Sequence, residues 1–155
     1  MKEAWQERIG QVTEQADKLL KDKGVLEGVG RIDYAAIFPK SEQEYSELMS
    51  VLQTNGEPVR EVPTGTVFQL REPLQTPQGE VPRVRVRIND SSKTQIGYVD
   101  YWVGDYPSFK DRYVPSGIIG ITHNQDGVEM LTTENEEVIV YFPQIPLGKD
   151  LGEGE

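Results

Sequence analysis

Three arginines alternate with valines in one short segment, Arg83-Val84-Arg85-Val86-Arg87. Successive side chains of a β-strand point to opposite faces, so a strand here would gather the three guanidinium groups on one face. Guanidinium groups bind carboxylates and phosphates through paired hydrogen bonds. The segment therefore predicts a site for a small anionic ligand. The alternative is a solvated strand face whose arginines pair with surface acids such as Glu57, Glu61 or Glu72.

A second alternating segment, over residues 96–103, carries aromatic rings and one carboxylate on the same face: Tyr98, Asp100 and Trp102. Aromatic walls suit a planar or partly apolar ligand, so these residues are predicted to contribute to the same binding site. Two simpler interpretations remain open. Asp100 would neutralise Arg85 as an internal ion pair, and the aromatic residues would serve only to pack the sheet.

Other kinds of chemistry find little support in this chain. The sequence has no cysteine, which excludes disulfides, thiolate catalysis and zinc bound through thiolate. His123, the one histidine, precedes the turn at residues 124–127, where a solvent-facing imidazole is expected. A single histidine also makes a Ser-His-Asp triad hard to support. No phosphate-binding loop, calcium-binding loop or HExxH motif is present.

Composition narrows the classes of partner. The chain of 155 residues has 26 acidic and 16 basic residues, a formal net charge of −10. This length suits one domain, and this charge repels nucleic acid and anionic membrane surfaces. No segment approaches the roughly 20 apolar residues that span a bilayer. The acidic, cysteine-free composition favours a cytoplasmic protein.

The elements that must position these side chains follow an order that occurs twice. The first half predicts a strand over 30–39, a helix capped by Ser41 and Glu44, and strands over 57–62, 65–71 and 80–89. After a polar linker at 90–94, the second half predicts a strand over 96–103, a short helix over 106–113, and strands over 117–123, 127–133 and 137–142. The expected fold class is therefore α+β, with two βαβββ modules at 30–89 and 95–142 inside a single domain over 25–148.

The two ends of the chain lie outside these modules. Residues 1–24 predict an amphipathic helix that ends at Gly24, and its apolar stripe comprises Trp5, Ile9, Val12, Ala16, Leu19 and Leu20. That stripe would either dock on the rest of the chain or form a homodimer. Residues 149–155 are rich in glycine and glutamate and predict a flexible tail.

Paired βαβββ modules resemble the glyoxalase, or vicinal oxygen chelate, superfamily, and three segments resemble its YecM-like branch. These segments are Gly-Arg-Ile-Asp33-Tyr34, the stretch from Thr64 to Leu74, and Ile-Gly-Tyr98-Val-Asp100-Tyr over 96–101. The resemblance implies a curved mixed sheet around a cavity that usually holds a divalent metal. In that branch the metal is bound by histidines and a glutamate.

The corresponding positions in this chain are Tyr34, Tyr98 and Asp100, and neutral phenols are poor ligands for such metals. We therefore expect a cavity without a metal or cofactor, in which Arg83, Arg85, Arg87, Tyr98, Asp100 and Trp102 bind a small anionic molecule. One alternative is a glyoxalase-type lyase or isomerase, with Asp100 as base and Tyr34 or Tyr98 as proton donor. The other is a structural or dimeric interaction protein.

Overall fold

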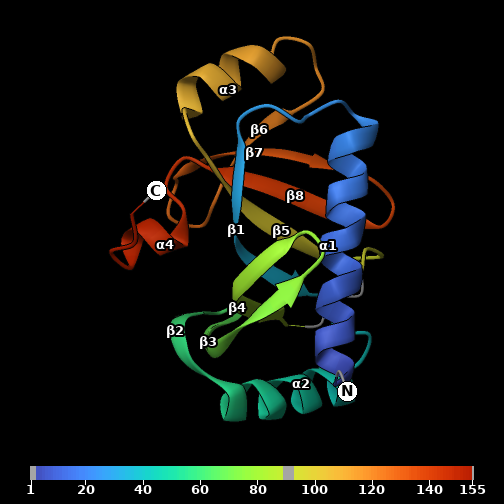
Figure 1. The fold of residues 1–155 in the computed structure, drawn as a ribbon. Helices are drawn as coiled ribbons and strands as arrows, with labels where there is room; N and C mark the ends of the chain where they lie inside the picture. Colours follow the sequence, from blue (N-terminus) through green and yellow to red (C-terminus); the bar gives the residue numbers. More distant parts are fainter. Residues whose placement is uncertain (1–2, 89–92, 155) are drawn as a thin grey trace.

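A computed structural model describes residues 3–88 and 93–154 and shows an α+β fold with a single eight-stranded mixed sheet (Figure 1). The strands are β1 (Val29–Ile37), β2 (Gly56–Val62), β3 (Gly65–Thr76), β4 (Gly79–Arg87), β5 (Gly97–Val103), β6 (Gly120–His123), β7 (Glu129–Glu134) and β8 (Val138–Pro143). The helices are α1 (Ala4–Asp22), α2 (Glu42–Asn55), α3 (Tyr106–Tyr113) and α4 (Leu147–Asp150). Within the described residues, no helix has the length and apolar character needed to cross a membrane.

The strand order across the sheet is β2-β3-β4-β1-β5-β8-β7-β6. β1 lies parallel to β4 and β5 lies parallel to β8, while β1 and β5 pair antiparallel at the centre. Each predicted strand is present, with ends that move by a few residues. β6 begins at Gly120 rather than at Gly117, because Gly117 has a positive φ of 82° in the turn that follows α3. The last residue of the predicted strand over 80–89 and most of the predicted linker at 90–94 lie outside the described residues.

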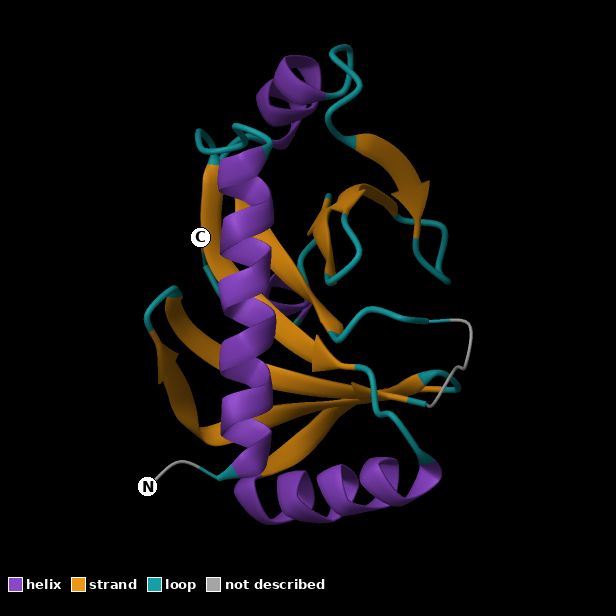
Figure 2. Ribbon diagram, turned by 90° about the vertical axis from the view of Figure 1, so that its right-hand side faces the viewer, coloured by secondary structure: helices purple, strands orange, loops and turns teal. Residues whose placement is uncertain are grey.

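Helix α1 covers one face of the sheet and contacts β1, β5 and β8 (Figure 2). The residues of its predicted apolar stripe are all at most 5% exposed. They belong to one core with Val84, Val86 and Val99, which project from the same face of the sheet. Burial of one such side chain contributes about 1.5–3 kcal/mol, so this stripe holds the helix firmly against its own chain. Docking of the N-terminal helix is thus confirmed, and the stripe is not available to a second copy.

Local chemistry explains how α2 begins. The Ser41 side chain accepts a hydrogen bond of 3.0 Å from the backbone N–H of Glu44, as its capping position predicts. The Glu44 carboxylate accepts from the backbone N–H of Lys40 at 2.8 Å. The helix therefore starts where the sequence predicts, although the glutamate caps the residue before Ser41.

Gly97 allows the two central strands, β1 and β5, to pair closely. At Gly97, an added Cβ would lie 2.0 Å from the carbonyl oxygen of Ala36, so only glycine allows this close approach of β5 to β1. The register places Ala36 beside Tyr98 on one side and beside Arg85 on the other. Because the methyl side chain of Ala36 is small, the two long side chains that flank it can meet above β1.

The C-terminal segment is folded where the sequence predicted a flexible tail. The carboxylate of Asp33 accepts hydrogen bonds from the backbone N–H groups of Leu147 at 2.8 Å and Gly148 at 2.9 Å. Glu153 forms an ion pair of 2.7 Å with Arg83. The expectation for residues 149–154 is therefore corrected, because buried charged groups in the sheet supply partners that a glycine-rich segment alone does not reveal.

Candidate functional site

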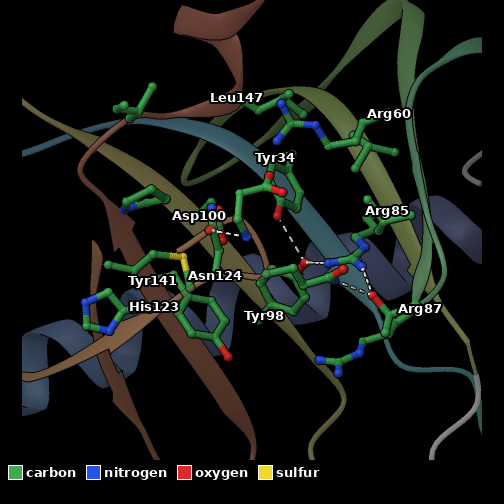
Figure 3. A pocket seen from close by; sticks show the side chains of 18 residues that line it. Tyr34, Arg60, Arg85, Arg87, Tyr98, Asp100, His123, Asn124, Tyr141 and Leu147 are labelled. Carbon is green, nitrogen blue, oxygen red and sulfur yellow. Dashed lines mark hydrogen bonds between the residues drawn. The ribbon is translucent and has the colours of Figure 1, made fainter. Parts of the chain in front are cut away.

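A cavity of about 230 Å³ lies on the face of the sheet opposite α1 (Figure 3). Strands β1, β4, β5 and β8 supply Tyr34, Arg85, Asp100 and Tyr141 to its wall. The turns after β2 and β6 supply its rim, and an apolar side comes from Ile145, after β8, and Leu147, at the start of α4. The cavity thus collects side chains from both halves of the chain, which only the folded sheet brings together.

A continuous row of hydrogen bonds crosses the cavity floor (Figure 3). The Arg85 Nη1 donates to the Tyr98 hydroxyl at 2.6 Å, and this hydroxyl lies 3.1 Å from that of Tyr34. On the other side, Arg85 Nη2 donates to the Thr64 hydroxyl at 2.7 Å. Gln125, in the turn after β6, also donates to Thr64, at 2.9 Å. The row therefore connects the two loops at the rim with the phenols on the floor.

Arg85 carries a positive charge with no acid paired to it among the residues that the structure describes. The residue is 9% exposed, and its Nε has no hydrogen-bond partner within residues 3–88 and 93–154. No Asp or Glu oxygen of the described chain forms an ion pair with it within 4.0 Å; its two hydrogen bonds described above go to neutral hydroxyls. The internal ion pair between Arg85 and Asp100 that the sequence allowed is therefore not formed. A buried cation in this state is costly unless an anion joins it, which makes Arg85 the strongest candidate for ligand binding.

Asp100 lines the same cavity and is 5% exposed. Its Oδ1 has no hydrogen-bond partner within the described residues. Burial, followed by the nearby charge of Asp33, raises the pKa of Asp100 well above its usual value, while the Tyr34 hydroxyl and Arg85 act in the opposite direction. The environment therefore shifts this carboxyl group toward its neutral acid form.

Three tyrosines form the aromatic wall of the cavity. The ring of Tyr98 makes edge contacts with Tyr34 and Tyr141, at centroid distances of 5.8 and 5.2 Å. Burial raises the pKa of all three phenols, that of Tyr141 to about 12, so each hydroxyl stays protonated at neutral pH. The wall therefore offers flat apolar surfaces together with neutral donors.

Further cations and a histidine lie around the cavity. Arg87 is half-buried, lines the cavity and places its guanidinium 5.8 Å from the ring of Phe38. Arg60 lines the opposite side and forms an ion pair of 3.0 Å with Asp150. His123 is exposed, as its place before a turn predicted, but it also belongs to the cavity lining.

Two of the predicted ligand-binding residues, Arg83 and Trp102, lie outside this cavity. The Arg83 side chain is fully buried and bonded to Asp33 at 3.2 Å and Glu153 at 2.7 Å. Trp102 is 4% exposed and has the guanidinium of Arg31 stacked 4.1 Å from its ring centroid. The C-terminal segment covers this end of the sheet, which explains why the arginine row divides into Arg85 and Arg87 at the cavity and Arg83 in a buried ion cluster.

The alternative that the arginines of β4 pair with the surface acid Glu57 is not what the structure shows. Glu57 pairs instead with Arg71, at 2.8 Å.

The sequence patterns did not identify Arg60, Thr64 and Gln125 as site residues. The two loops that hold Thr64 and Gln125 were recognisable as turns, but no local pattern shows that they meet over Arg85.

The residues at this site do not fit a divalent metal. Tyr34, Tyr98 and Asp100 occupy the positions where the resemblance implies ligands, and the Arg85 guanidinium lies 2.6 Å from the Tyr98 hydroxyl. A cation at this point repels a second cation, and the phenols are held in their protonated form. Among the residues that the structure describes, no group of three or more His, Cys, Asp or Glu is arranged to hold a metal ion.

Comparison with known proteins identifies the fold but no family. No protein-family model matches the chain, and no curated protein matches it. A solved structure described as "Structural Genomics, Protein EC4020" is similar, with a TM-score of 0.73 and 12% sequence identity. The similarity covers 96% of this chain and 90% of that one. At 12% identity the similarity shows that the fold is a known one, and it gives no information about activity.

Proposed function

We propose that this protein binds a small anionic ligand in the cavity, without a metal, and that Arg85 is the main binding residue. The observation that carries the proposal is the buried Arg85 guanidinium, which has no acid among the described residues within 4.0 Å and an Nε without a partner. A ligand carboxylate or phosphate in the cavity would supply the missing negative charge beside this guanidinium. Arg87 adds a second positive charge at the same cavity.

The charge and size of the cavity set the class of ligand. The chain carries a net charge of −10, yet Arg85 and Arg87 face a cavity in which Asp100 is held toward its neutral form. The volume of the cavity is about 230 Å³. It is smaller than the range of about 300–1,000 Å³ that is typical of drug-sized ligands. The tyrosine wall favours a ligand with a carbon body attached to its anionic group.

We also infer that the sheet is of the glyoxalase, or vicinal oxygen chelate, type. Two features support this inference. The order strand-helix-strand-strand-strand occurs twice along the chain, and in each half the first strand lies parallel to the last. The cavity then lies between the two halves, with Arg85 from the first and Tyr98 and Asp100 from the second.

The alternatives receive less support than binding. A lyase or isomerase that uses Asp100 as base needs its carboxylate, and burial shifts this carboxyl group toward its neutral acid form. Pairing of two copies through the N-terminal helix would require the apolar stripe that the sheet already covers. A cytoplasmic location stays a prediction from composition.

Isothermal titration and thermal unfolding with small anions test the proposed function. We expect acetate, benzoate or inorganic phosphate to raise the melting temperature of the wild-type protein in a saturable manner. A ligand at 100 times its Kd adds about 2.7 kcal/mol of stability. Arg85→Met should remove this effect, because methionine keeps most of the side-chain length but carries no charge.

The matched control is Arg71→Met, which removes an exposed arginine on the neighbouring strand β3. This variant should bind anions as the wild type does. Equal loss of binding in both variants, or none in Arg85→Met, would contradict the proposal, because either result would mean that anions bind the protein surface in general. Stabilisation by a divalent metal would contradict its metal-free part.

A further inference from the structure

A second residue that lines the cavity, Asp100, has a polar atom without a partner among the described residues. The Oδ1 of Asp100 has no hydrogen-bond partner within the described residues, although the residue is only 5% exposed. Asp100 lies directly opposite Tyr34 in the pairing of β5 with β1, and Tyr34 contacts Tyr98, which contacts Arg85. Asp100 and Arg85, each with one polar atom that has no partner among the described residues, therefore lie at opposite ends of one polar row.

The surroundings of Asp100 decide what it can bind. The charged and titratable groups that face it are Asp33 and Tyr34 on β1, Arg85 on β4, Tyr98 on β5 and Tyr141 on β8. Burial raises its pKa, and the charge of Asp33 adds to that rise. A neutral carboxylic acid has an O–H group to donate, so its natural partner is an acceptor oxygen that carries no full charge. A second carboxylate or a phosphate at this end would be repelled by Asp33.

We propose that the ligand is a short oxo acid, with its carboxylate on Arg85 and its carbonyl oxygen on the side chain of Asp100. This inference rests on the proposed function and defines its ligand class. The carbon chain between the two groups would lie against Tyr141 and Leu147, which line the cavity with apolar surface. Asp100 then selects the carbonyl group, whereas Arg85 holds any carboxylate.

Three acids of equal chain length test this selection: pentanoate, 2-oxopentanoate and 4-oxopentanoate. Each has about eight non-hydrogen atoms or fewer, which suits a cavity of about 230 Å³. Isothermal titration at pH 6.5 and fixed salt gives the Kd of each. We expect at least one oxo acid to bind the wild type about threefold to tenfold more tightly than pentanoate, the effect of one added neutral hydrogen bond.

Variants at Asp100 assign the preference to this residue. Asp100→Asn keeps a donor of similar shape, so the preference for the oxo acid should persist. Asp100→Ala and Asp100→Val remove the donor, so the oxo acid should bind no better than pentanoate while pentanoate itself still binds. Two substitutions of different volume are used so that a folding defect in one does not decide the result, and thermal unfolding checks both.

The results separate the inference from the proposed function. If pentanoate binds through Arg85 and neither oxo acid binds more tightly, the anion site stands and the oxo-acid inference is overturned. A preference that survives in both Asp100→Ala and Asp100→Val overturns it as well. If no acid binds the wild type, the proposed function fails together with the inference.

Discussion

Replacement of Asp33 by alanine should destabilise the protein strongly, because this carboxylate joins the sheet to the C-terminal segment. Asp33 is fully buried and accepts from Arg83 at 3.2 Å and from the backbone N–H groups of Leu147 and Gly148. The substitution leaves a buried guanidinium with Glu153 as its one remaining acid in the described chain, and it leaves two amide groups unsatisfied. Removal of one partner from a buried charge pair costs about 3–5 kcal/mol.

Urea unfolding at 25 °C measures this loss. Burial raises the pKa of Asp33 despite the opposing N–H groups and Arg83, so the measurement is made at pH 8 to shift this carboxyl group toward its charged form. The matched control is Asp150→Ala, which removes an exposed acid of the same segment and should cost less than about 1 kcal/mol. Because Leu147 lines the cavity, Asp33→Ala should also weaken anion binding. A loss below about 1 kcal/mol for Asp33→Ala would refute the role of Asp33 as the anchor of this segment.

Two further predictions concern the cavity and the sheet that supports it. The pKa of Asp100 is higher in the folded protein than in the unfolded chain. The free energy of unfolding therefore falls as pH rises from about 4 through the pKa of Asp100 in the folded protein. Asp100→Asn should therefore raise the urea midpoint at pH 7, with a gain that shrinks toward pH 4; a gain independent of pH would contradict the assignment. Gly97→Ala should cost more than about 3 kcal/mol or prevent folding, because its Cβ would lie 2.0 Å from the Ala36 oxygen. Gly104→Ala has no atom within 4 Å of the new Cβ and should change stability by less than about 1 kcal/mol, so similar losses at both glycines would argue against the close strand approach.

Much of the fold was predictable because local patterns and tertiary packing agree. The apolar stripe of α1 and the alternation in β4 and β5 follow the periods of a helix and of a strand, and their apolar residues pack in one core. The hydrogen bond at Ser41 forms at the predicted start of α2. The strand ends were less predictable, since they depend on which glycine takes a positive φ, as Gly117 does.

The site was predictable only in part. Alternation correctly placed Arg85, Arg87, Tyr98 and Asp100 on one face, and all four line the cavity. Alternation alone does not reveal that Arg83 lies beneath the C-terminal segment, because that depends on a contact with Glu153, far away in the sequence. The same limit applies to Thr64 and Gln125, whose loops meet only after the whole sheet has formed.

A crystal structure of the protein with bound benzoate tests the central claim most directly, because it shows where the anion lies. The account predicts that the carboxylate occupies the cavity with its oxygens about 3 Å from the Arg85 guanidinium and its ring against the tyrosine wall. A carboxylate bound instead at the exposed Arg31 or Arg71, with the cavity filled by water alone, would contradict it.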